Sequence, residues 1–152
     1  SVPHPLAVDL GLKTGLAVYD DAGALVRYRS QNYGSFARLK RGAYGELAEI
    51  SELAAVVLEG DVLLARAWTR IAARRGARTF VIQAHTWRRR LLLDREQRSG
   101  VDAKAAAGEV ARRIIEASDA PRPTSLKHDA AEAILIGWCG CMELGWTEQM
   151  PP

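Results

Sequence analysis

Two carboxylates stand in apolar stretches of the chain where a charged side chain is unexpected. Asp9 lies in the run Leu6–Leu10 and Glu59 ends the run Ala54–Glu59, and a glycine follows each run. A buried and unpaired carboxylate is costly because it loses its hydration, so each of these needs hydrogen bonds, a cation or a metal ion. Taken singly, each is also typical of a carboxylate that caps a loop at a strand end.

A third acidic feature opens an apolar helical stretch near the C-terminus. Asp129 and Glu132 are three residues apart and therefore share one face of the predicted helix. Acids in a first helical turn are also favoured by the helix dipole alone. If this helix covers the ends of the central strands, all four carboxylates converge on one point. Carboxylate oxygens suit Mg²⁺ or Mn²⁺, and two such ions per site can activate water and stabilise a leaving oxygen in phosphodiester hydrolysis.

The charge distribution favours a polyanionic partner. The net charge is +3, and because the residues after His128 hold four acids and no lysine or arginine, the rest of the chain carries +7. Between Gly60 and Arg113 there are thirteen basic and five acidic residues. Of the 21 basic residues 17 are arginines, whose planar guanidinium suits phosphate contacts. Codon bias is an alternative source of the arginine preference, but it does not explain the clustering.

Several basic residues and one tryptophan are candidate DNA contacts. Lys13 and Lys127 border the proposed metal site, and Trp87 next to three arginines could stack on a base or could pack the following helix on the sheet. His128 is a candidate metal ligand or proton donor, with a solvated residue as the alternative. The complete set of candidate DNA contacts is Lys13, Arg66, Arg70, Arg74, Trp87, Arg88, Arg89, Arg90, Arg98, Lys104 and Lys127.

The strands and helices that the sequence predicts around these residues indicate one α/β domain over residues 1–152. The apolar periodicity predicts, in order, strands at 6–10, 16–20 and 24–29, a helix from 35 to 50, a strand at 54–59, a helix from 61 to 76, a strand at 79–82, and helices at 102–117 and 125–143. This βββαβαβαα order predicts a five-stranded mixed sheet with helices on both faces. The segment around Arg88 is expected to be a basic connection that leads to Gly100.

The flanks and the cysteines predict the environment of the domain. No apolar run approaches the roughly 20 residues of a membrane helix, and the N-terminus lacks the pattern of a secretory signal. Cys139 and Cys141 are too close together to staple distant parts of a fold. We therefore expect a soluble protein in a reducing, cytoplasmic compartment, with no membrane partner.

Three segments together resemble the RuvC-like Holliday junction resolvases of the RNase H-like superfamily, which include chloroplast and poxvirus enzymes. They read AVDLGLKTGLAVYD around Asp9, VVLEGD around Glu59 and KHDAAEAILIG around Asp129. The resemblance implies an RNase H-like fold, a homodimer, and a structure-selective endonuclease that cuts four-way DNA junctions with two Mg²⁺ or Mn²⁺ ions. It makes Asp9, Glu59, Asp129 and Glu132 the catalytic metal ligands, and it suggests a nucleoid-associated bacterial or phage protein.

The sequence departs from the RuvC pattern in two places. Glu132 stands where RuvC has an aspartate, which lengthens the carboxylate side chain by one methylene. No aromatic residue follows Glu59, where bacterial RuvC places a wedge that stacks at the junction centre.

Two other functions stay open from the sequence. Glu46, Glu49 and Glu52 are expected on the helix before the Glu59 strand, where ordinary RNase H enzymes carry a glutamate, so a nuclease acting on RNA–DNA hybrids or flaps is one alternative. A non-catalytic module that only binds junctions is the other.

Overall fold

The computed structural model describes residues 3–152 and contains one mixed sheet between helical layers. The strands, in the spatial order β3-β2-β1-β4-β5, are β1 (His4–Asp9), β2 (Lys13–Tyr19), β3 (Leu25–Asn32), β4 (Leu53–Glu59) and β5 (Arg78–Val81). β1 pairs antiparallel with β2 and parallel with β4, which makes β1 the central strand. The predicted α/β class and the five-stranded mixed sheet are confirmed.

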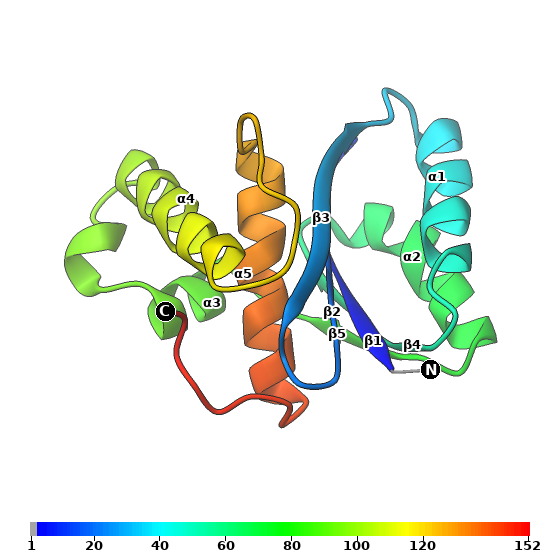
Figure 1. The fold of residues 1–152 in the computed structure, drawn as a ribbon. Coiled ribbons are helices and arrows are strands. Elements are labelled where there is room, and N and C mark those ends of the chain that lie inside the picture. The colour runs from blue at the N-terminus through cyan, green and yellow to red at the C-terminus, as the bar shows by residue number, and fades with distance from the viewer. Residues whose placement is uncertain (1–2) are drawn as a thin grey trace.

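The helices cover both faces of this sheet. Figure 1 shows α1 (Phe36–Ala48) and α2 (Val62–Arg74) on one side, and α3 (Ala84–Leu91), α4 (Gly100–Glu116) and α5 (His128–Glu143) on the other. A 3-10 turn, η1 (Asp94–Gln97), connects α3 to α4. None of the helices in residues 3–152 is long and apolar enough to cross a membrane.

Alternation along the strands divides the buried side chains into two cores. Leu6 and Val8 of β1 pack with the α1 and α2 layer, whereas Ala7 between them packs with the α4 and α5 layer. Successive residues of a strand point to opposite faces, so Asp9 lies on the same face as Ala7. By the same alternation, Val57 and Glu59 of β4 face α5. The acids on both strands are therefore directed to one helix.

The helix starts carry local capping signals. Ser35, Asp61 and Ser99 each accept a hydrogen bond from a backbone N–H in the first turn of α1, α2 and α4 respectively. Such caps satisfy N–H groups that have no partner within the helix. Asp61, where the sequence predicts that the second helix starts, is the N-cap of α2.

Arg75 fastens the end of α1 to the end of α2. Its guanidinium donates hydrogen bonds to the carbonyl oxygens of Leu47 and Ile50, and to that of Ser51 at 3.2 Å. These carbonyls lie at and after the last turn of α1, where intrahelical donors run out. One side chain thus closes the helix end and holds the two helices together.

The sequence-based description missed one helix and displaced some boundaries. The segment expected to be a basic connection contains α3, in which Trp87 and Leu91 are buried at a four-residue spacing. The predicted order βββαβαβαα therefore lacks a helix between β5 and the last two helices. α5 begins at His128 rather than at 125, and α1 ends at Ala48, so Glu49 caps that helix and Glu52 lies beyond it.

Candidate metal centre

Asp9 and Glu59 lie side by side at the ends of two adjacent parallel strands. The register pairs Asp9 with Glu59, and the N–H of Leu10 donates to the carbonyl oxygen of Glu59 at 2.7 Å. Both residues face α5, as the alternation requires. Two carboxylates are thereby held at one edge of the sheet by backbone pairing alone.

Three glycines, one on β2 and two on α5, allow the helix to pack unusually close to the sheet. A Cβ atom on Gly15, the residue paired with Asp9 on β2, would lie 1.8 Å from the carbonyl oxygen of Asp129. A Cβ on Gly137 would lie 2.3 Å from the ring of Tyr19, and one on Gly140 would lie 2.6 Å from a methyl group of Val57. Any side chain larger than hydrogen would push the helix outward. Close packing along the helix is what brings the first turns of α5 down to the strand ends.

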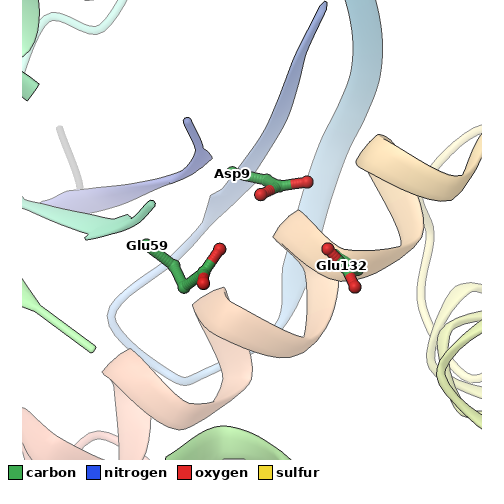
Figure 2. Close-up of side chains that lie close together, drawn as sticks. All are labelled: Asp9, Glu59 and Glu132. Atoms are coloured by element: carbon green, nitrogen blue, oxygen red, sulfur yellow. The ribbon is translucent and has the colours of Figure 1, made fainter. Parts of the chain in front are cut away.

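α5 adds a third carboxylate to the strand pair. One oxygen each of Asp9, Glu59 and Glu132 lie within 4.8 Å of one another, and Figure 2 shows the three carboxyl groups gathered between the strand ends and α5. Asp9 and Glu132 are each 8% exposed, and Glu59 is half-buried. The three residues come from β1, β4 and α5, which are far apart in the chain.

Crowding and burial make the carboxyl of Asp9 hard to ionise. Burial raises the pKa of Asp9 to about 9, and the charges of Glu132, Glu59 and Asp129 and a hydrogen bond with Glu59 push it in the same direction. The pKa of Glu59 is also raised, chiefly by burial, although the Asp9 hydrogen bond and Arg88 act against this shift. In the absence of a cation, Asp9 therefore keeps its proton and shares it with Glu59 near neutral pH.

Two basic side chains flank Glu132. His128, one turn earlier on α5, places Nε2 at 3.2 Å from Oε1 of Glu132, and Arg88 of α3 places Nη2 at 3.7 Å from the same oxygen. The Nε of Arg88 is buried without a hydrogen-bond partner among the described residues. Arg88 is one of the predicted DNA contacts, and the structure places it beside Glu132. The four-residue spacing of the apolar Trp87 and Leu91 was the signal that could have revealed α3 and, with it, this contact.

Asp129, the fourth predicted ligand, lies beside the group formed by Asp9, Glu59 and Glu132 rather than within it. Its Oδ2 accepts a hydrogen bond from the Ser30 hydroxyl at 3.5 Å. Its charge is nevertheless near enough to raise the pKa of Asp9. Asp129 is thus positioned to approach the Asp9 side of the centre.

Three of the predicted DNA contacts are engaged within the protein, and Arg88, which pairs with Glu132, is the first of them. Trp87 is 1% exposed and packs in the core with α4 and α5, so it offers no face to a base, and the prediction that it stacks on DNA is wrong. Arg90 donates to Glu143 at 2.5 Å and to the sulfur of Cys139 at 3.7 Å, which ties α3 to α5.

The other predicted DNA contacts are exposed and fall on different sides of the molecule. Lys13 follows the β1 end and Lys127 precedes α5, so both flank the acidic centre. The α2 arginines lie across the sheet from α5 (Figure 1). The remaining exposed candidates on the α5 side are Arg89, Arg98 and Lys104.

The donor set of the centre fits a hard divalent cation. The three carboxylates supply only oxygen ligands, which Mg²⁺ and Mn²⁺ prefer, and no cysteine lies among them. A cation between them would replace the proton on Asp9 and offset the mutual repulsion that raises its pKa. Comparison with protein-family models and with curated proteins finds no match for this chain.

Proposed function

We propose that the chain is a divalent-metal-dependent endonuclease with an RNase H-like fold that resolves four-way DNA junctions. The observation that carries this proposal is the convergence of Asp9, Glu59 and Glu132 from two adjacent strand ends and a covering helix. The strand order and the position of α5 are compatible with an RNase H-like arrangement. The excess of basic over acidic residues supports DNA as the partner.

In this proposal the residues of the centre have three roles: they bind metal, orient the phosphate and position Glu132. Asp9, Glu59 and Glu132 would hold a Mg²⁺ or Mn²⁺ ion, and Asp129 together with Asp9 would hold a second. Ions held there supply water activation and charge stabilisation for phosphodiester hydrolysis. Lys13 and Lys127 would orient the phosphate beside the centre, and Arg88 and His128 would hold the Glu132 carboxylate in place through their contacts with its Oε1.

The surroundings of Glu46 favour a resolvase over an ordinary RNase H. Glu46 is 3% exposed, and it pairs with Arg29 and, at 3.6 Å, with Arg27, both from β3. These contacts hold the one buried glutamate of α1 on the opposite face of the sheet from Asp9. The acid that a hybrid nuclease would need from the preceding helix is therefore engaged elsewhere.

A junction resolvase must cut two strands symmetrically, so the proposal includes a homodimer. A two-fold axis would present one acidic centre to each of two strands of like polarity. We also propose that the enzyme acts on nucleoid DNA in the cytoplasm of a bacterial or phage-infected cell.

The test is cleavage of a labelled four-way junction in parallel with a duplex, a flap and an RNA–DNA hybrid of matched sequence. Each substrate is incubated with Mg²⁺, Mn²⁺ or EDTA, using wild type, Asp9→Asn and Glu148→Gln, the last removing an exposed acid outside the centre. The proposal predicts paired nicks in the junction alone, with either metal. It also predicts loss of cutting in EDTA and in Asp9→Asn but not in Glu148→Gln.

Each other result points to a different function. Cutting of the hybrid in preference to the junction would replace the resolvase with an RNase H-type nuclease. Tight and salt-sensitive junction binding, with no cutting under either metal, would leave a non-catalytic binding module.

A further inference from the structure

A groove runs between α1 and α2, on the face of the sheet opposite the acidic centre. It encloses about 400 Å³, and Ala67 and Ile71 contribute to its apolar lining. Three residues at four-residue steps on each helix form two rows of about 12 Å along its walls. These rows are Phe36, Lys40 and Tyr44 on α1, and Arg66, Arg70 and Arg74 on α2.

The cations of this groove form no ion pair with an acidic side chain among residues 3–152. No acidic residue lines the groove, and across residues 3–152 the three α2 arginines make no ion pair. Arg27 and Arg90, by contrast, are each paired with a glutamate. Like charges at a four-residue spacing repel one another, so an anion bound along these three arginines would relieve that repulsion.

The opposite wall carries exposed aromatic rings. Phe36 is 45% exposed and Tyr44 is 65% exposed, and Nζ of Lys40 lies 5.7 Å from the centroid of the Phe36 ring. Exposed rings beside a row of cations are the two features with which proteins bind single-stranded nucleic acid. The rings stack on unpaired bases and the cations follow the backbone.

Other occupants satisfy only part of this surface. A duplex keeps its bases stacked inside and leaves the rings unused, and a peptide of acidic residues alone has no aromatic ring to stack on them. A second copy docked symmetrically through the same groove would set the arginines of both copies against each other. Only an unpaired nucleic-acid strand uses both walls.

We infer that the α1–α2 groove binds single-stranded nucleic acid, with its phosphates along Arg66, Arg70 and Arg74 and its bases against Phe36 and Tyr44. Helices α1 and α2, which line the groove, lie on the opposite face of the sheet from α5, which carries Glu132 (Figure 1). Binding in the groove therefore needs neither a metal ion nor the carboxylates, and it does not depend on the proposed nuclease activity.

The test is fluorescence anisotropy of a short labelled oligothymidylate titrated with the full chain in EDTA. Tyr44→Ala is expected to weaken binding about 5- to 150-fold, and Tyr44→Phe, which keeps the ring, is expected to restore most of it. Arg70→Ala is expected to weaken binding and to reduce the slope of log K against log salt by roughly 0.7. Arg41→Ala is the matched control, because Arg41 is exposed on α1 and does not line the groove.

Four results would overturn the inference. The first is an absence of binding to oligothymidylate by wild type, and the second is equal binding by wild type, Tyr44→Ala and Arg70→Ala. The third is tighter binding of a duplex than of the single strand, with no effect of Tyr44→Ala. The fourth is a labelled polyglutamate that binds more tightly than the oligonucleotide at equal salt, which would assign the groove to an acidic protein segment.

Discussion

The carboxyl groups of Asp9 and Glu59 are neighbours because the parallel register of β1 and β4 pairs the two residues, and a hydrogen bond joins their side chains. The pairing of the central strands fixes the neighbouring Cα positions from which both side chains project. Glu132 approaches the same pair from α5, and its charge raises the pKa of both. The fold thus enforces a concentration of negative charge that a proton relieves in part and a divalent cation would relieve more fully.

The first prediction concerns the pH dependence of stability without metal. The pKa of Asp9 is about 9 in the folded protein and 3.8 in the reference state, so between these values the folded chain holds a proton that the unfolded chain has lost. Stability from this group therefore falls as pH rises through that window. Asp9→Asn removes the effect. In EDTA its Tm should exceed that of wild type by a few degrees at about pH 8 and by less at about pH 5, at roughly 2–4 °C per kcal/mol.

Thermal unfolding followed by circular dichroism at both pH values measures this difference. Asp94→Asn is the control, since that residue lies in η1 away from the acidic centre. A gap between Asp9→Asn and wild type that stays constant or shrinks as pH rises would contradict the raised pKa.

The second prediction concerns metal binding. A divalent ion must displace the proton of Asp9, so binding of Mg²⁺ or Mn²⁺ should release a proton and should strengthen as pH rises toward about 9. Calorimetric titration in two buffers of different ionisation enthalpy measures the protons released. Glu132→Gln should weaken Mn²⁺ binding by at least about tenfold, which is ~1.4 kcal/mol, whereas Glu148→Gln should not. Binding that is unaffected by Glu132→Gln would place the ion elsewhere.

The sequence revealed those parts of the centre that follow from local patterns. Two continuous apolar runs predicted buried strands, with Asp9 inside the first and Glu59 at the end of the second. The three-residue spacing put Asp129 and Glu132 on one helical face. The structure brings Asp9, Glu59 and Glu132 together. Asp129 instead accepts a hydrogen bond from Ser30 on β3, a partner that no local pattern identifies.

The parts that the sequence did not reveal depend on contacts between distant elements. The three consecutive arginines obscured the spacing of Trp87 and Leu91, whose burial defines α3. Arg88 therefore was expected on an open surface, although its partner is Glu132. Similarly, the sequence left Glu46 as a candidate metal ligand, whereas in the structure it forms an ion pair with Arg29 of β3.

The third prediction tests the hydrogen bonds by which Arg75 joins the ends of α1 and α2. Arg75→Met removes three hydrogen bonds to carbonyls at the end of α1 while it keeps an aliphatic side chain. Hydrogen bonds with a charged partner contribute about 1.5–3 kcal/mol each. Because these bonds are partly exposed and the Leu47 carbonyl also accepts from the Ile50 N–H, we expect a loss of roughly 2–4 kcal/mol. Urea unfolding should show a lower midpoint, with Arg41→Met, an exposed arginine of α1, unchanged within about 0.5 kcal/mol. Equal midpoints for the two variants would mean that the Arg75 hydrogen bonds add no stability.

The fourth prediction tests the close approach of α5 to the sheet. A Cβ on Gly15 would lie 1.8 Å from the Asp129 carbonyl oxygen, so Gly15→Ala must displace the start of α5, at a cost of about 1–3 kcal/mol for overpacking. The displacement moves Glu132 away from Asp9, so the variant should also bind Mn²⁺ more weakly than wild type. Gly108→Ala is the matched control. A Cβ on Gly108, inside α4, meets nothing within 4 Å, so this change should stabilise the protein by roughly 0.5–1 kcal/mol and leave Mn²⁺ binding unaltered. If Gly15→Ala unfolded at the wild-type urea concentration and bound Mn²⁺ normally, the packing of α5 against Gly15 would not be what positions the third carboxylate.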